Sequence, residues 1–245
     1  MTTHSTTRRN VLRGAAWTTP AIALATAAPA TASSPDPCEP TPVTVDWESA
    51  DYVRVSPSRG YYTIPLSDET TMRLDIRAEF VNMRPNGEGT TDDQLALSTF
   101  DIGGTGEPGL ILHQNDRQHL GRNGYQKVTF TFNRTLTTLD FQITDIDWYR
   151  EDFRDAVRPG SNLVATPQDT LEVTRSGFYR PKVTGATENK SGDNNLKLHG
   201  EQITEFTVEY ANHDRNYYWW GASEDRAQRV FLTDFVLTVP PIGCP

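Results

Sequence analysis

The stretch KVTFTF at residues 127–132 decides the fold class of this chain. Its apolar side chains, Val128, Phe130 and Phe132, stand at every second position and alternate with polar ones. A period of two is typical of a β-strand with one buried face, because successive side chains of a strand point to opposite faces. The same alternation recurs in MRLDIRAEF (72–80), LDFQIT (139–144) and FTVEY (206–210).

The rest of the chain adds shorter strands separated by turn residues. Residues 230–239 are apolar at positions on both faces, which predicts a central strand. Weaker strand candidates lie at 43–47, 52–55, 61–64, 95–100, 109–113 and 171–174. No segment after residue 33 repeats apolar residues at helical spacing.

We therefore predict an all-β protein. Many short strands with regular turn signals favour a single β-sandwich, which we expect over residues 43–245. A jelly-roll-like arrangement is our first choice. The alternative is an immunoglobulin-like sandwich, but such domains are usually shorter and carry an internal Cys…Trp…Cys pattern that this chain lacks.

Residues 1–32 have the parts of an export signal peptide and are predicted to lie outside the fold. Arg8 and Arg9 open a basic segment, an Ala-rich apolar stretch follows at 14–28, and small residues at 30–32 precede the expected cleavage point. The paired arginines, followed by Val-Leu-Arg, resemble the twin-arginine signal of bacterial exported proteins. That resemblance implies the twin-arginine export machinery as a partner and a secreted, extracellular protein. A Sec signal or a disordered basic tail is the alternative.

The mature chain is predicted to begin with a Pro-rich lead-in at residues 33–42 and to be acidic. The full chain of 245 residues has a formal net charge of −9. Loss of residues 1–32 removes three arginines and no acids, which takes the charge to −12. An acidic chain repels polyanions, so we expect no nucleic-acid partner. No apolar run after the signal is long enough for a membrane span.

Cys38 and Cys244 are the only cysteines and stand near the two ends of the predicted mature chain. An exported chain meets an oxidising compartment, so we expect them to form a disulfide bond. The bond would require the two ends of the domain to be adjacent, as domain termini often are. The alternative is two unpaired thiols in frayed tails.

The apolar row of residues 139–147 ends in two carboxylates, Asp145 and Asp147. Two neighbouring carboxylates repel each other, so a positive partner is expected between them. Calcium suits this position, because it takes several oxygen ligands, often from one loop. The predicted calcium ligands are Asp145, Asp147, Asp152 and Asp155. The alternatives are open solvation or pairing with nearby arginines, namely Arg150, Arg154 and Arg158.

Two segments carry a likeness to a known type of domain. Residues 141–147 read FQITDID and residues 229–234 read RVFLTD. Together with the strands between them, over about residues 126–239, they resemble the jelly-roll domain of secreted and surface-attached bacterial proteins. The resemblance implies a non-catalytic sandwich on the cell exterior, often of unknown ligand.

An aromatic run stands between the last two predicted strands, and its members are Tyr217, Tyr218, Trp219 and Trp220. Aromatic rings beside Asn, Asp and Arg suit sugar binding, because rings stack on the apolar faces of sugars while polar groups bind the hydroxyls. We take these four residues as candidate ligand-binding residues. The alternative is a hydrophobic plug over the end of the sandwich.

The chain has no serine-nucleophile, zinc-protease or phosphate-loop motif, so we identify no catalytic residue. The leading prediction is a secreted, non-catalytic sandwich that binds a ligand or cell-surface component, such as an extracellular glycan, and is stabilised by calcium. The second is a carbohydrate-active enzyme on a jelly-roll scaffold. The third is a structural or adhesive exterior domain.

Overall fold

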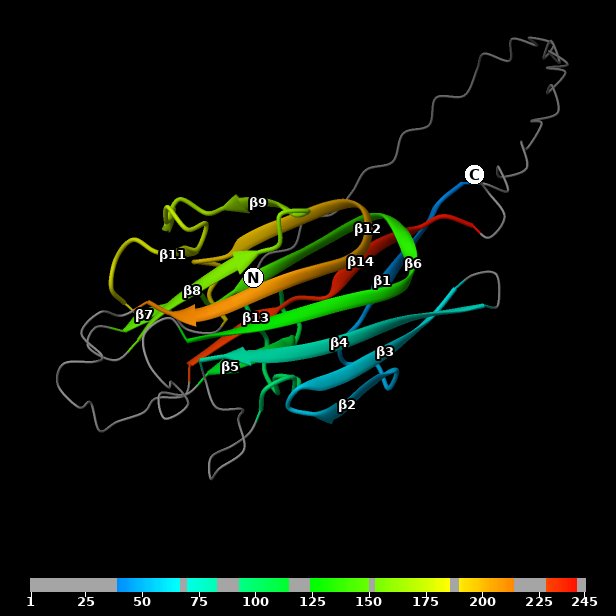
Figure 1. The fold of residues 1–245 in the computed structure, drawn as a ribbon, viewed down its shortest axis with the longest axis horizontal. Helices are drawn as coiled ribbons and strands as arrows, with labels where there is room; N and C mark the ends of the chain where they lie inside the picture. Colours follow the sequence, from blue (N-terminus) through cyan, green and yellow to red (C-terminus); the bar gives the residue numbers. More distant parts are fainter. Residues whose placement is uncertain are drawn as a thin grey trace, which may run out of the picture. The chain divides into compact units, whose positions relative to one another are not determined.

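The two longest strands, β6 (Tyr125–Thr144) and β12 (Leu196–Asn212), organise the fold. They pair with each other in antiparallel register, from Leu196 opposite Ile143 to Ala211 opposite Tyr125. Both strands bend near their middle, so that each contributes one half to each of two facing layers (Figure 1). The two layers of the sandwich are therefore continuous with each other through these two strands.

The computed structural model describes residues 39–66, 70–82, 93–114, 124–149, 153–185, 190–213 and 228–241. All of them lie in one compact unit, Asp36–Pro245. Every regular element in this part of the chain is a strand. Besides β6 and β12, the strands are β1 (Thr41–Val45), β2 (Tyr52–Ser56), β3 (Arg59–Pro65), β4 (Thr71–Val81), β5 (Leu110–Gln114), β7 (Trp148–Tyr149), β8 (Phe153–Pro159), β9 (Val164–Pro167), β10 (Leu171–Val173), β11 (Tyr179–Pro181), β13 (Gln228–Leu232) and β14 (Phe235–Val239).

We name the two layers A and B. Layer A contains, in order, β10, β11, β8, the second half of β12, the first half of β6, β4, β3 and β2. Layer B contains β9, the first half of β12, the second half of β6, and then β13 and β14. Two more strands continue layer B beyond β13 and β14: β5 pairs with β13, and β1 pairs with β14.

The bend in β12 has a local cause in the backbone. The register with β6 shifts between Ile203 and Glu205, and Gln202 adopts a left-handed conformation with φ of 52°. Gly200 lies just before the shift, and a Cβ atom there would come within 2.8 Å of the side chains of Ile203 and Leu163. A bulge of this kind increases twist and bends a strand, which carries β12 from one layer to the other.

The core lies between the layers and centres on a cluster of buried phenylalanines. Phe130 and Phe206 of layer A stack with ring centroids 4.7 Å apart. Phe235 of layer B lies 5.6 Å from Phe130 and 5.7 Å from Phe206. The predicted all-β sandwich is thus confirmed, because the alternating apolar rows of the two layers meet in one core.

Most predicted strands are confirmed, and three expectations were wrong in detail. The segments 127–132 and 139–144 belong to one strand, β6, because the chain bends between them without leaving the sheet. Residues 95–100 hold only an isolated bridge at Leu97. The single central strand predicted over residues 230–239 is instead two strands, β13 and β14, because the register against β6 shifts by one residue between Leu232 and Val236.

The two ends of the described chain lie side by side. β1 pairs with β14 in antiparallel register, with Thr41 opposite Val239. Cys38 and Cys244 themselves lie outside the described residues. In the part of the chain that the structure describes, no helix is long and apolar enough to cross a membrane.

Candidate functional site

Three of the four predicted calcium ligands meet at one corner of the sandwich. β6 ends at Thr144, and Asp145 then takes a left-handed conformation with φ of 61°, so the two acids do not continue the apolar row as predicted. Asp155 lies on β8, where its backbone N–H donates to Asp147 O at 2.8 Å. Its Oδ2 accepts the backbone N–H of Asp147 at 3.0 Å. Asp152 lies outside the described residues.

Hydrogen bonds hold this acidic corner. Tyr210 OH donates to Asp155 Oδ1 at 2.6 Å, and Asn194 Nδ2 donates to Asp147 Oδ1 at 3.0 Å. Burial raises the pKa of Asp155 well above its usual range, and repulsion from Asp147 and Asp145 adds to the rise. The described residues contain no group of three or more His, Cys, Asp or Glu side chains that could hold a metal ion. Calcium binding at this corner stays a prediction.

A buried layer of glutamines, which was not predicted from the sequence, lies at the same end of the core. Four segments contribute one glutamine each, all at most 1% exposed: Gln94, Gln114, Gln126 and Gln228. Gln114 Nε2 donates to Tyr210 O, and Gln126 Nε2 donates to His113 O at 3.0 Å. Gln94 Oε1 accepts the backbone N–H of His113 at 2.6 Å.

This glutamine layer keeps several amide atoms without a hydrogen-bond partner in the protein. They are Gln94 Nε2, Gln114 Oε1, Gln126 Oε1 and both amide atoms of Gln228. The sequence does contain a signal for this layer. In three strands, the position two residues beyond the alternating apolar residues is a glutamine. Gln126 precedes Val128, Gln228 precedes Val230, and Gln114 follows Leu112.

A larger feature lies on the outer face of layer A, where the curved sheet forms a groove of about 730 Å³. We call it the outer groove. Its lining comes from five strands, β2, β3, β4, β6 and β12. Charged side chains of both signs line it: Arg59, Arg73, Arg77 and Lys127, with Asp75, Glu79 and Glu205. In the sequence these residues occupy the polar positions of strands in which polar and apolar residues alternate. Nothing in the sequence distinguishes them from residues on an ordinary solvent-exposed face.

Several side chains of the outer groove hold one another in place. Arg73 Nε lies 2.9 Å from Asp75 Oδ1, and its guanidinium stands 4.2 Å above the ring centre of Tyr61. Thr131 Oγ1 donates to Glu205 Oε2 at 3.0 Å. The floor of the groove is a sheet, and these contacts link side chains of its lining to one another.

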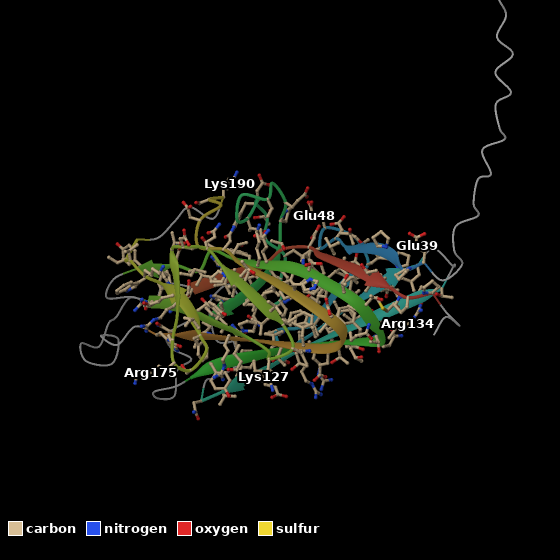
Figure 2. All side chains as sticks on the ribbon, turned by 90° about the horizontal axis from the view of Figure 1, so that it is seen from above. Glu39, Glu48, Lys127, Arg134, Arg175 and Lys190 are labelled. Carbon is tan, nitrogen blue, oxygen red and sulfur yellow. The ribbon has the colours of Figure 1, made fainter. Side chains whose placement is uncertain are left out.

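A second hollow of about 430 Å³ adjoins the outer groove on the same face. Lys127 lines both, and it projects from the outer side of layer A while Glu48 and Lys190 lie on the opposite side (Figure 2). In register, Lys127 lies between Glu79 of β4 and Glu209 of β12. The register thus places one cation, flanked by two acidic residues, at the junction of the two hollows.

The fold and the site together define the class of this protein: an all-β sandwich with a charged groove across one outer face. Comparison with known proteins finds no matching family model, no matching curated protein and no matching solved structure. The resemblance to a bacterial surface jelly roll therefore stays a prediction. The candidate ligand-binding residues Tyr217, Tyr218, Trp219 and Trp220, and the signal residues Arg8 and Arg9, lie outside the described residues.

Proposed function

We propose that this chain is an exported, non-catalytic binding protein that holds an extracellular glycan in the outer groove of layer A. One observation carries the proposal: a groove of about 730 Å³ crosses five strands, and charged and hydroxyl-bearing side chains stand all along it among apolar surface. Ligand sites usually occupy a volume of this order. A sugar suits such a lining, because it has hydroxyl groups for the polar side chains and apolar ring faces for the rest.

The direction of the groove favours a chain-like ligand. Neighbouring strands lie roughly 5 Å apart, so five strands span about 19 Å between the outermost backbones. Along that span, Thr129 and Thr131 offer hydroxyls while Tyr61 offers a ring edge beside Arg73. The backbone below these side chains is already fixed by the sheet, so binding costs side-chain freedom but no backbone ordering. A polysaccharide segment fits such a row of donors and acceptors.

The second candidate is a glycoside hydrolase, and one observation favours it. Asp75 of β4 and Glu205 of β12 both lie opposite Thr131 of β6, one on each side. Their backbones are therefore two strand spacings apart, roughly 10 Å. Inverting glycosidases use two carboxyl groups at a comparable separation. Release of reducing ends from a bound polysaccharide distinguishes this activity from binding alone.

The remaining features support an exterior location. The twin-arginine-like signal would send the chain out of the cell, and a disulfide between Cys38 and Cys244 would be expected there. The pairing of β1 with β14 supports that disulfide, because it brings Thr41 opposite Val239, a few residues from each cysteine. The aromatic run at 217–220 connects Asn212 of β12 to Gln228 of β13 in the sequence, and we retain it as a second sugar-contacting candidate.

Glycan-array screening of residues 33–245, followed by calorimetry on the polysaccharides that bind, tests the proposal. Lys127→Gln is expected to weaken binding several-fold, because Lys127 lines both hollows. Lys197→Gln is the matched control, since Lys197 is an exposed lysine on the layer B half of β12. Binding that both variants leave unchanged, or an array without hits, would contradict the proposal.

A further inference from the structure

Two arginines of the outer groove face each other across neighbouring strands. Arg59 of β3 lies directly opposite Arg77 of β4, and both line the groove. Their side chains are exposed and on the same face of layer A. Like charges directly opposite each other in a sheet repel, so this pair lowers stability unless an anion lies between them.

The protein supplies no such anion in the part of the chain that the structure describes. Other arginines of layer A have carboxylate partners: Arg73 pairs with Asp75 at 2.9 Å, and Arg158 pairs with Glu209. Neither Arg59 nor Arg77 takes part in an ion pair or a side-chain hydrogen bond there. Asp75 and Glu79 flank Arg77 on the same face of β4, two residues away on either side, but neither forms an ion pair with it.

The chemistry of guanidinium groups favours an oxyanion of the ligand, such as a carboxylate, as the missing partner. Arginine presents a planar fork of N–H donors that matches a carboxylate with two parallel hydrogen bonds. Thr129 of β6 lies opposite Arg77, and Lys127 lies two residues before Thr129 on the same strand. Lys127 therefore adds a third cation nearby.

The carboxylates of the outer groove disfavour a densely charged polyanion as its ligand. Asp75, Glu79 and Glu205 are interspersed among the cations, so a nucleic acid or an anionic membrane surface would meet carboxylates at every approach. A polysaccharide of uronic acids carries one carboxylate per sugar and leaves hydroxyls between them. Across the strands of the groove, Arg59 and Arg77 are followed by Thr129 of β6, so a hydroxyl group lies beside the two cations.

We infer that the outer groove selects an acidic glycan, a polymer containing uronic acids, and that Arg59 and Arg77 together bind one of its carboxylates. This inference rests on the proposed function, because it specifies the glycan that the same groove would hold. It also explains why an exposed like-charged pair is present on an otherwise acidic protein.

The experiment compares three uronate polymers, polygalacturonate, alginate and hyaluronate, with methyl-esterified polygalacturonate, which has the same backbone but blocked carboxylates. Calorimetry with residues 33–245 is expected to show binding of at least one uronate polymer. The methyl ester is expected to bind at least about tenfold more weakly than polygalacturonate itself, since a hydrogen-bonded charge pair is lost. Binding is also expected to weaken as salt is added.

Arg59→Gln and Arg77→Gln are each expected to weaken uronate binding about tenfold, while Arg175→Gln, at an exposed arginine outside the groove, leaves it unchanged. Thermal melting gives an independent measure, because removing either charge relieves repulsion and does not lower the melting temperature. If the protein binds neutral glycans, and neither Arg59→Gln nor Arg77→Gln weakens that binding, this inference is wrong and the proposed function stands. Binding to no polysaccharide would overturn both, and equal binding to anionic vesicles would overturn the choice of a glycan.

Discussion

Replacing Asp234 with asparagine is expected to stabilise the protein at neutral pH and to have no effect at acidic pH. Asp234 lies between β13 and β14, and its Oδ1 accepts the backbone N–H of Trp47 at 3.1 Å. Partial burial raises the pKa of Asp234 to about 6, and repulsion from Asp46, Glu107 and Glu48 adds to the rise. Asparagine keeps the acceptor for Trp47 and cannot ionise.

The sign follows from proton binding in the two states. The folded carboxyl has a pKa of about 6, while the unfolded one has its ordinary value near 4, so the folded state holds the proton more tightly. The stabilisation is complete below about pH 4 and is lost as the pH rises toward 6. Two pKa units correspond to about 3 kcal/mol, and screening at this half-exposed position reduces that to about 1 kcal/mol.

Urea unfolding of the wild type and of Asp234→Asn at pH 4, 5, 6 and 7 measures the effect. The two proteins are expected to be equally stable at pH 4 and to differ by about 1 kcal/mol at pH 7, with the variant more stable. Asp169→Asn, at an exposed aspartate on the surface, controls for a general change in net charge. A variant that matches the wild type at pH 4 but is less stable at pH 7 would contradict this prediction, because it would mean that the carboxylate charge itself stabilises the fold.

Four further predictions test other parts of the account. Phe206→Ala is expected to cost about 3–5 kcal/mol of unfolding free energy in urea, because Phe206 stacks on Phe130 in the core; a cost below about 1 kcal/mol would contradict the packing. Gln228→Met is expected to raise that free energy by about 1–3 kcal/mol, since it removes two buried amide atoms without protein partners; a loss of stability would mean that these atoms are bound by something else. Mass spectrometry of the exported, unreduced protein is expected to find Cys38 linked to Cys244, with a lower melting temperature after reduction; free thiols would exclude the bond. Calcium added to chelator-treated protein is expected to raise the melting temperature, and no shift at millimolar calcium would exclude an ion at the acidic corner.

The alternation of apolar residues predicted most strands because that pattern depends only on neighbours in the chain. It failed where a strand bends. In β6 the buried positions are even-numbered up to Leu136 and odd-numbered from Leu139 to Ile143, so the bend resembles a break between two strands. β9 and β11 are short pieces with little alternation, and their positions are set by pairing with β12 and β8.

The candidate site was predictable only where its residues are close in sequence. Asp145, Asp147 and Asp155 lie within one short segment, and the structure does bring them together. The outer groove depends on which residues of different strands lie opposite each other. The pairing of Arg59 with Arg77 follows from the register of β3 on β4, which no local pattern in either strand specifies. The sequence could have predicted the glutamine layer, but only by following each apolar row one further step of two residues.

The central claim is that the outer face of layer A is a glycan-binding surface, and mapping a bound glycan by backbone NMR tests it most directly. Titration of isotope-labelled protein with a polysaccharide that binds is expected to shift amide signals of residues 59–61, 73–79 and 127–131, which line the groove. Signals of residues 196–200 and 235–239, in layer B, are expected to stay unchanged. Shifts confined to layer B, with the groove residues unaffected, would contradict the account.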